Sequence, residues 1–345
     1  MKRLVVGIGI SALLLYLVIR KVIWHELIVA FREIHYLYLI PVIILTLLSL
    51  FLRAWRWHYL LAPVERVGLA PLVSATAIGL AANNLLPARL GEVVRAYAIG
   101  RQTGLPVSAS FATIIVERIL DVFTLLGFLS FSLLLCPTVF GPPGQTATLI
   151  DPLGRSTTLF SWVVRSGFIA LLMTLGIMVI LAIIVVVPEK SEAFLIQVTR
   201  KFSQRLGGWF KGTVHSFIVG LGVYRDWRLL GASLLLSVAV WFAIVGAMYY
   251  AFQTCGLSLP IAAPVVVMAI LAFGLMIPSA PGFVGTFQWF TVAGLSLFAV
   301  GESRALSFSL VFHATQFFTI TSFGLVALYR EGLSLGTLRY ANRRE

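Results

Sequence analysis

Apolar runs long enough to cross a lipid bilayer recur along most of this chain, and they restrict its fold more than any other feature. A helix needs ~20 apolar residues to cross about 30 Å of hydrocarbon. Five runs exceed that length: residues 36–61, 107–135, 160–187, 229–252 and 305–329. The sequence therefore predicts five full spans.

A sixth apolar run, residues 4–19, follows Lys2 and Arg3 and resembles the core of a signal peptide. No small-residue cleavage site comes after it, and Arg20 and Lys21 follow directly. We interpret it as an uncleaved first helix. Because it is short for a span, a helix lying on the membrane surface is the alternative.

The composition agrees with a membrane protein. Hydrophobic residues make up 59% of the 345 residues and charged residues 11%, whereas soluble domains are about 25% charged. A single soluble core stops growing near ~250–300 residues, so this much apolar surface needs lipid as its solvent. We predict an all-α polytopic protein of the cell (inner) membrane. It would form one transmembrane domain over residues 1–345, with about six spanning helices.

The chain is strongly basic, with 26 Lys and Arg against 13 Asp and Glu and a net charge of +13. Its arginines lie beside or within apolar runs, which favours anionic membrane lipids over nucleic acid as partners. Motifs such as HExxH, CxxC and the P-loop are absent from the sequence, so we predict no catalytic residue, cofactor or metal. Cys136 and Cys255 show no metal-ligand spacing. The sequence leaves open whether the two cysteines form a disulfide. It also leaves the oligomeric state open, and a homo-oligomer is one of the alternatives.

Two further apolar stretches are interrupted by Pro and Gly. One break is at Pro87 and the other at residues 278–282 (Pro-Ser-Ala-Pro-Gly), and each separates an apolar stretch from a second short apolar piece, residues 93–99 and 283–300. Proline ends a helix and frees backbone groups that lipid cannot satisfy, so such breaks occur where protein or water surrounds them. We predict two re-entrant hairpins, near residues 69–101 and 261–300. Pairs of ordinary spans joined by short loops are the alternative.

Charge asymmetry sets the expected orientation. Residues 188–228 carry seven Lys/Arg and three Asp/Glu, and the tail after Tyr329 carries four and two. The positive-inside rule places both segments, and therefore the two termini, in the cytoplasm. Residues 188–228 also alternate apolar and basic positions at helical spacing, as an amphipathic helix on the anionic inner leaflet would. A helix docked beneath the bundle is the alternative.

This orientation makes the two hairpins enter the membrane from opposite sides. Pro87 and Pro278 lie 191 residues apart, and each hairpin is preceded and followed by a span. We therefore predict an inverted repeat, residues 36–135 and 229–330, which is an architecture shared by many transporters.

The break in the first hairpin is rich in polar residues: Asn83, Asn84, Arg89, Glu92 and Arg95. Guanidinium groups bind phosphate through two parallel hydrogen bonds, and amides at the turn add neutral donors. Glu92 and Arg95 are spaced to pair when the site is empty. The pattern predicts a phosphate-recognising pocket, with a cytoplasmic loop of orientation-setting arginines as the alternative.

A second polar group, Glu117, Arg118 and Asp121, lies within an apolar run. The two carboxylates share one helix face, and Arg118 can reach Asp121. Each ionisable group near the bilayer centre costs roughly 2.5–3.5 kcal/mol on insertion scales, so the group needs partners, for which Arg89 and Arg95 are candidates. It predicts a gate or a proton-coupled network. A static salt-bridge cluster is the alternative.

Weaker signals remain elsewhere. Arg53 and Arg56 end the second span beside two tryptophans, which favours a snorkelling interfacial belt. Ser279, Gly282 and Gln288 lie in and after the second break and predict an outward half of a headgroup site, or a tight packing turn. All three are substrate-binding candidates.

His313 lies on the last span. It is a candidate for gating or proton coupling, although an intramembrane histidine is more often part of a hydrogen-bonded structure.

Three motifs occur in order: Asn84-Leu-Leu-Pro-Ala-Arg-Leu-Gly-Glu-x-x-Arg95, Glu117-Arg118-x-x-Asp121 and Pro278-x-x-Pro-Gly-x-x-Gly285. Together they resemble the flippase-like membrane domain of lysylphosphatidylglycerol synthetases and its stand-alone relatives, over essentially the whole chain. The resemblance implies movement of a lipid between leaflets. The soluble synthase domain of the two-domain members is missing here, which argues against lipid synthesis. Some members occur beside glycosyltransferases in lipid-linked sugar pathways, so the resemblance leaves the cargo open.

The second break is often followed by an acidic residue in this family, whereas this chain has Gln288. We expect a lipid transporter, flippase- or scramblase-like, for a phospholipid or another phosphate-bearing lipid. Its headgroup would enter between the hairpins, with Arg89, Arg95 and Arg118 holding phosphate. The alternatives are an intramembrane lipid-headgroup transferase and a scaffold for a glycosyltransferase pathway.

Overall fold

The structure is a computed structural model. It describes residues 2–20, 22–86, 90–135, 148–150, 156–187, 189, 215–277 and 279–332. The two break prolines, Arg89, Cys136 and residues 190–214 of the predicted amphipathic segment lie outside the described residues. The predictions made for them therefore stay predictions.

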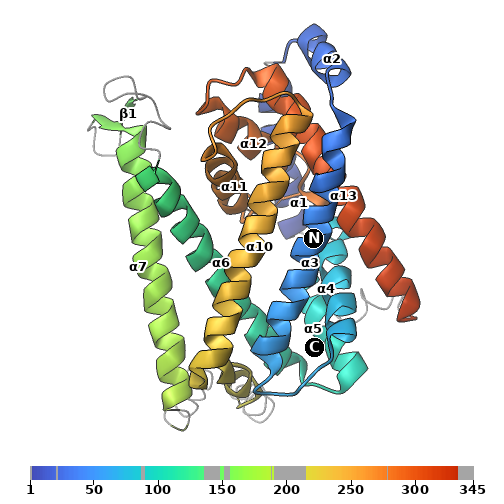
Figure 1. The fold of residues 1–345 in the computed structure, drawn as a ribbon, viewed down its shortest axis with the longest axis vertical. Coiled ribbons are helices and arrows are strands. Elements are labelled where there is room, and N and C mark those ends of the chain that lie inside the picture. The colour runs from blue at the N-terminus through green and yellow to red at the C-terminus, as the bar shows by residue number, and fades with distance from the viewer. Residues whose placement is uncertain are drawn as a thin grey trace. The chain divides into compact units, whose positions relative to one another are not determined.

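Long helices dominate the described part of the chain (Figure 1). They are α1 (Lys2–Ile19), α3 (Leu39–Leu61), α6 (Val107–Leu135), α7 (Leu159–Val186), α10 (Trp227–Thr254) and α13 (Glu302–Arg330). Each coincides, within a few residues, with a predicted apolar run. Among the described residues, Tyr36–Leu61, Trp227–Thr254 and Glu302–Arg330 are long and apolar enough to cross a membrane. The all-α polytopic membrane fold is confirmed.

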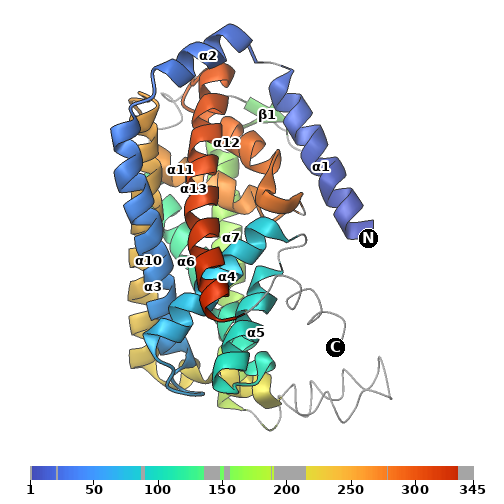
Figure 2. The ribbon, with the colours of Figure 1, turned by 90° about the vertical axis from the view of Figure 1, so that its right-hand side faces the viewer.

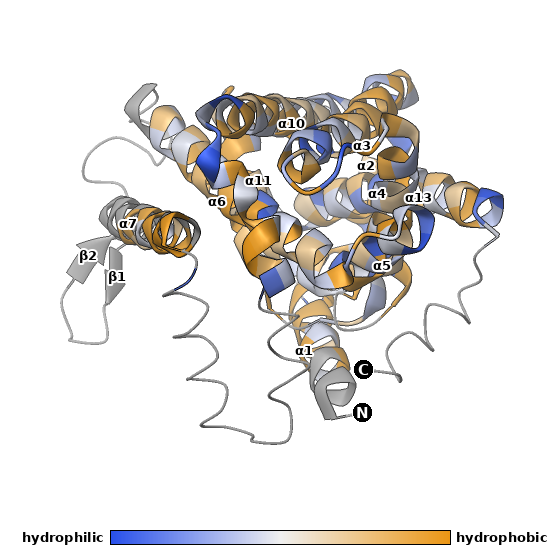
Figure 3. Ribbon diagram, turned by 90° about the horizontal axis from the view of Figure 1, so that it is seen from below, coloured by the Kyte–Doolittle hydropathy of each residue, from blue (hydrophilic) through white to orange (hydrophobic). Residues whose placement is uncertain are grey.

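Large apolar side chains on these helices point outward. Leu235 and Phe242 on α10 and Phe318 on α13 are exposed, and Figure 3 colours α7 and α10 predominantly hydrophobic. Exposed apolar surface on this scale would be unstable in water. These apolar faces are therefore suited to contact with the hydrocarbon chains of lipid.

Some smaller elements were not anticipated from the sequence. Helix α2 (Trp24–Arg32) and the 3-10 turn η1 (Tyr36–Tyr38) separate α1 from α3. Strands β1 (Thr148–Ile150) and β2 (Ser156–Thr158) form a two-stranded antiparallel sheet before α7. The 3-10 turn η5 (Gly222–Arg225) leads into α10. These segments are too short for apolar periodicity to reveal them.

Both predicted breaks lie between pairs of short packed helices. In the first, α4 (Leu69–Leu85) packs against α5 (Gly91–Thr103), and Figure 2 shows the two side by side. In the second, α11 (Ala263–Gly274) packs against α12 (Thr286–Ser296), with the 3-10 turn η6 (Pro281–Phe283) between them.

Three of these four helices are too short to cross a bilayer. Helices α5, α11 and α12 have 13, 12 and 11 residues, which at 1.5 Å per residue gives roughly 17–20 Å against about 30 Å of hydrocarbon. Their lengths favour hairpins over pairs of full spans. The depth of each hairpin in the membrane and the inverted repeat stay predictions.

The chain divides into two compact units. Unit 1 contains residues 1–46, 123–174 and 242–318, and unit 2 contains residues 47–122, 175–241 and 319–345. The hairpin α11–α12 belongs to unit 1, together with α1, and the hairpin α4–α5 belongs to unit 2.

Small residues bring the helices of unit 2 into backbone contact. A Cβ on Gly91 would collide with the carbonyl oxygen of Gly79 and with the side chain of Asn83, and a Cβ on Gly324 would collide with Ala77 and Ala81. Helix α4 therefore lies directly against α5 and the last part of α13, as small-residue contacts in membranes allow. This packing fixes the position of the residues that α5 carries.

We expect Gly91→Ala to lower the free energy of unfolding by about 1–3 kcal/mol, because the added methyl group has to displace the α4 backbone. A shift in the thermal unfolding midpoint of the detergent-solubilised protein measures the effect. Gly127→Ala on α6 is the matched control, since a Cβ there meets nothing within 4 Å. Equal midpoints for both variants would contradict the close α4–α5 contact.

Candidate functional site

Arg56 on α3 is a fully buried cation in unit 2. Its Nη1 donates to Asp121 Oδ1 at 2.6 Å and to Ser237 Oγ at 2.8 Å. Its Nη2 lies 3.1 Å from Glu117 Oε1. One guanidinium group thus connects α3 to two carboxylates of α6 and to a hydroxyl of α10. Glu117 and Asp121 can both face it because residues four apart share a helix face.

Arg95 on α5 completes the buried pairing. Its Nη1 lies 2.9 Å from both carboxylate oxygens of Glu117, and its guanidinium group lies over the ring of Trp57, 3.9 Å from the ring centroid. Trp57 is held in turn by Nε1, which donates to Thr113 Oγ1 at 2.8 Å. The Glu117 carboxylate and the Trp57 ring together hold the Arg95 guanidinium group in place.

Arg118 makes longer contacts with the carboxylates than Arg56 and Arg95 do. It lies 3.3 Å from Glu117, 3.5 Å from Asp121 and 3.9 Å from Glu92. Its side chain is 42% exposed, whereas those of Arg56 and Glu117 are fully buried. Arg118 is therefore held loosely by three carboxylates at the open side of the cluster. Arg53 also approaches Asp121, at 3.6 Å.

These seven residues, called the charge cluster below, are Arg53, Arg56, Glu92, Arg95, Glu117, Arg118 and Asp121. Four guanidinium groups meet three carboxylates, so the cluster carries one more positive than negative charge. Several of its N–H donors, namely Nε and Nη2 of both Arg56 and Arg95 and Nε of Arg118, have no hydrogen-bond partner among the described residues. Unused charged donors in a buried site are costly unless a ligand satisfies them. The cluster therefore fits an added anion.

The two asparagines of the first hairpin have separate roles. Asn83 accepts from the Gly91 N–H at 2.9 Å and donates to Glu92 at 3.4 Å, so it joins the end of α4 to the start of α5. Asn84 donates to Thr321 Oγ1 at 3.0 Å. Of the residues predicted for the first site, the structure brings Asn83, Glu92 and Arg95 together. Asn84 contacts α13 instead.

The second hairpin, in unit 1, contains a chain of neutral hydrogen bonds. The Gly285 N–H donates to Gln288 Oε1 at 2.7 Å, and Gln288 Nε2 lies 3.0 Å from His313 Nδ1. His313 stacks on Phe287 with 4.2 Å between ring centroids and has a backbone hydrogen bond to Gly282. Gln288, Gly282 and His313 are therefore neighbours, while Ser279 lies half-buried before the turn.

The directions of these bonds fix the form of His313. Because Gln288 Oε1 accepts from a backbone N–H, its Nε2 must face His313 as a donor. His313 Nδ1 is then an acceptor, which leaves a neutral ring with its proton on Nε2. This arrangement favours a structural role for His313 over the predicted proton coupling. The side chain that links the turn to His313 is the neutral amide of Gln288.

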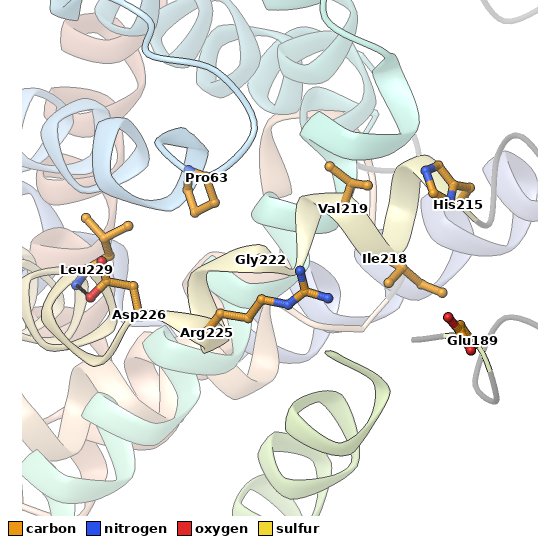
Figure 4. A pocket seen from close by; sticks show the side chains of 9 residues that line it. All are labelled: Pro63, Glu189, His215, Ile218, Val219, Gly222, Arg225, Asp226 and Leu229. Carbon is orange, nitrogen blue, oxygen red and sulfur yellow. Dashed lines mark hydrogen bonds between the residues drawn. The ribbon is translucent and has the colours of Figure 1, made fainter. Parts of the chain in front are cut away.

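A cavity of about 560 Å³ lies elsewhere in unit 2 (Figure 4). Its lining residues are Pro63, Glu189, His215, Ile218, Val219, Gly222, Arg225, Asp226 and Leu229. Asp226 serves as the N-cap of α10, because its Oδ1 accepts from the Arg228 N–H at 2.8 Å. The lining mixes both signs of charge and includes no residue of the charge cluster. Among the described residues, no group of three or more His, Cys, Asp or Glu could hold a metal ion.

Comparison with known proteins gives the family. The family model described as "Lysylphosphatidylglycerol synthase TM region" matches residues 4–324. The chain belongs to this family. All the described cluster residues fall within the matched range.

Similar proteins come from archaea. A UPF0104 membrane protein of Methanothermobacter thermautotrophicus is 25% identical over 331 residues, which cover 89% of each chain. Another from Methanocaldococcus jannaschii is 23% identical over 249 residues, covering 72% of this chain and 92% of that protein. Glycosyltransferase AglD of Haloferax volcanii is 24% identical over 288 residues, covering 77% of this chain but 44% of that protein. No solved structure matches.

Two residues of the cluster differ from the sequence-based interpretation. A snorkelling belt was expected for Arg56 beside Trp57, but both side chains are fully buried, so the belt interpretation is wrong for them. Arg95 pairs with Glu117, for which it was one of two candidate partners, and not with Glu92, which was expected to pair with it in the empty site and lies near Arg118 instead. The spacing of Arg53 and Arg56 on one helix face was the signal available in the sequence, because two cations on one buried face need carboxylates opposite.

We expect Arg56→Met to lower the free energy of unfolding by about 3–5 kcal/mol, because it leaves two buried carboxylates undercompensated. Arg118→Met should cost at most about 1 kcal/mol, since Arg118 is half-exposed and loosely paired. Thermal unfolding in detergent compares the two. Equal losses of unfolding free energy for the two variants would contradict the different burial of the Arg56 and Arg118 guanidinium groups.

The neutral network can be checked by nitrogen-15 NMR of histidine-labelled protein. We expect His313 to show an unprotonated Nδ1 and a protonated Nε2 at neutral pH, because Nδ1 faces a donor. Comparison with His313→Gln assigns the signal among the five histidines. A protonated Nδ1 would show that the Gln288 contact has been oriented wrongly.

Proposed function

We propose that this protein moves a phosphate-bearing lipid between the two leaflets of the membrane, with the charge cluster of unit 2 binding the phosphate. The observation that supports this most directly is the one excess positive charge of the cluster, together with unused donors on three of its arginines, Arg56, Arg95 and Arg118. A phosphate oxygen accepts such charge-assisted hydrogen bonds, often two from one guanidinium group.

The buried and exposed arginines have different roles in this proposal. Arg56 keeps Glu117 and Asp121 in place through its contacts of 3.1 Å and 2.6 Å. Arg118, at 3.3 Å or more from each carboxylate, leaves them most easily. The arriving phosphate would take Arg118 together with the free N–H groups of Arg95.

Glu117 and Asp121 would act by exchanging guanidinium partners. When Arg118 turns toward phosphate, Arg95 and Arg56 still compensate Glu117, and Arg53 and Arg56 still compensate Asp121. The two buried carboxylates thus keep cation partners, which keeps the cost of a charged group in the membrane low. Glu92, whose side chain is partly exposed, gives up its contact with Arg118 and keeps the Asn83 amide at 3.4 Å. Proton uptake by these carboxylates is not needed.

Family membership supports a membrane function that involves lipids. The family is that of the transmembrane region of lysylphosphatidylglycerol synthase. The short helices of the two hairpins also resemble the discontinuous helices of transporters, which line polar sites at membrane depth.

We expect Arg118→Gln to lower the initial rate of lipid translocation roughly tenfold or more, because one charge-assisted hydrogen bond to phosphate is lost. The assay uses vesicles of phosphatidylcholine and phosphatidylglycerol containing NBD-labelled phosphatidylglycerol, with dithionite to bleach the outer leaflet. Arg95→Gln should act in the same direction.

Arg304→Gln is the matched control, because it removes the same charge from an exposed residue whose contact is a surface pair with Glu33 at 3.6 Å. Its rate should equal that of the unmodified protein. Equal rates for Arg118→Gln, Arg95→Gln and Arg304→Gln would refute the assignment of the site. No translocation by the unmodified protein would refute transport of this lipid.

One observation favours a second candidate function. A relative named as a glycosyltransferase matches 77% of this chain over 44% of its own length. This match is consistent with a chain that acts as a membrane domain assisting a glycosyltransferase. This candidate predicts copurification of a glycosyltransferase from native membranes, undiminished by Arg118→Gln, together with no translocation by the purified protein.

A further inference from the structure

Helix α1 contacts the rest of unit 1 through one of its faces. Ser11 and Val18, seven residues apart and on one face, are buried, whereas Ile8, Leu13 and Tyr16 on its other faces are exposed. The buried face packs against α12, the second helix of the hairpin α11–α12. Figure 2 shows α1 obliquely placed beside this hairpin.

A side chain of α1 binds the backbone of the hairpin turn. Ser11 Oγ accepts a hydrogen bond from the Ala280 N–H at 2.8 Å. A backbone N–H at membrane depth needs an acceptor, because lipid supplies none. Ser11 therefore provides a hydroxyl oxygen where the turn presents a donor.

The turn is shaped to receive α1. Gly285 has a φ of +88°, which side-chain-bearing residues rarely adopt, and a Cβ on it would collide with the carbonyl oxygen of Ser11. Only glycine meets both requirements. The backbone of α1 thus lies directly on the turn, with no side chain between them.

Three other polar groups of the turn have partners within unit 1 that do not belong to α1. The Gly285 N–H is bound by Gln288, the Phe283 N–H by the Ala280 carbonyl at 3.0 Å, and the Phe283 carbonyl by Thr286 Oγ1 at 2.9 Å. The Ala280 N–H differs, because its acceptor belongs to another helix. Removing α1 would leave these three bonds in place and would open the Ala280 N–H close to Gly285.

We propose that α1 is a displaceable gate on this turn, and that Ser11 Oγ occupies the place of an oxygen of the transported lipid's headgroup. The inference rests on the proposed lipid transport. When α1 moves away, a phosphate or hydroxyl oxygen of the headgroup accepts the Ala280 N–H, and Gly285 leaves room for its approach. Lipid and α1 therefore compete for one donor.

The other end of α1 is held, which gives the gate a hinge. Residues 20–23, where described, are not helical, and the Ile23 N–H donates to Ser303 Oγ at the start of α13 at 3.1 Å. Val22 beside it is buried. The helix can swing from this anchored end while its Ser11 region leaves the turn.

A reversible cross-link tests the gate. Ser11→Cys and Ala280→Cys are introduced together after Cys136 and Cys255 are replaced by Ser, and the protein is reconstituted into the vesicles described above. Oxidation should abolish most translocation of NBD-labelled phosphatidylglycerol, and reduction of the same sample should restore it. Full translocation by the completely oxidised protein would overturn the proposal.

The control is the pair Ile23→Cys and Ser303→Cys, which fixes the hinge and should leave the rate unchanged upon oxidation. A single variant gives the opposite sign: Ser11→Ala removes one hydrogen bond from the closed state and should raise the rate by up to about fivefold. A rate at or below that of the unmodified protein would contradict the gate even if the cross-linked variant failed to refold.

The two proposals fail differently. If the unmodified protein moves lipid and the cross-link has no effect, the gate is wrong and transport stands. If the unmodified protein moves no lipid under either condition, the proposed transport is wrong.

Discussion

The ion pairs of Arg56 with Glu117 and Asp121 are the interaction on which the rest of the candidate site depends. Two carboxylates buried within apolar helices would be strongly unfavourable without a cation between them. Arg56 supplies it from α3 at 3.1 Å and 2.6 Å, and Ser237 of α10 satisfies a further donor. With Glu117 fixed, Arg95 of α5 has a buried partner, and its position over Trp57 follows.

In this arrangement, one arginine fixes the buried carboxylates and another is available to bind a ligand. Arg56 is fully buried, while Arg118 has three more distant partners and a partly exposed side chain. A ligand that entered the cluster would meet Arg118 first, and Glu117 and Asp121 would keep their other guanidinium partners as Arg118 moved. The hairpin of unit 1 follows a different principle, since Gln288 and His313 form a neutral hydrogen-bonded chain. Specific charge recognition is therefore concentrated in unit 2.

The sequence was sufficient for those features that depend on length and periodicity. The long apolar runs coincide with α3, α6, α7, α10 and α13, and both Pro/Gly breaks lie between short helices. The pairing of Arg118 with Asp121 followed from their spacing on one helix. The charge of Arg95 identified it as a candidate partner for the α6 carboxylates, but its contact with Glu117 required the close approach of α4 and α5.

Arg56 shows why the rest was not predictable. A span that ends in Arg and Trp has the composition of an interfacial belt, and sequence alone does not reveal whether those side chains meet headgroups or a neighbouring helix. The answer depended on α6, which is distant in sequence and places two carboxylates opposite. The contact between Ser11 and Ala280 is similar, because residues 269 positions apart meet through a backbone group that any sequence would supply.

A structure of the protein in nanodiscs containing phosphatidylglycerol tests the central claim most directly. The account predicts lipid phosphate within hydrogen-bonding distance of the Arg95 and Arg118 guanidinium groups, with Arg118 turned away from Glu92 and Arg56 unchanged. Ordered lipid bound elsewhere, with Arg118 still on its three carboxylates and no anion in the charge cluster, would contradict it.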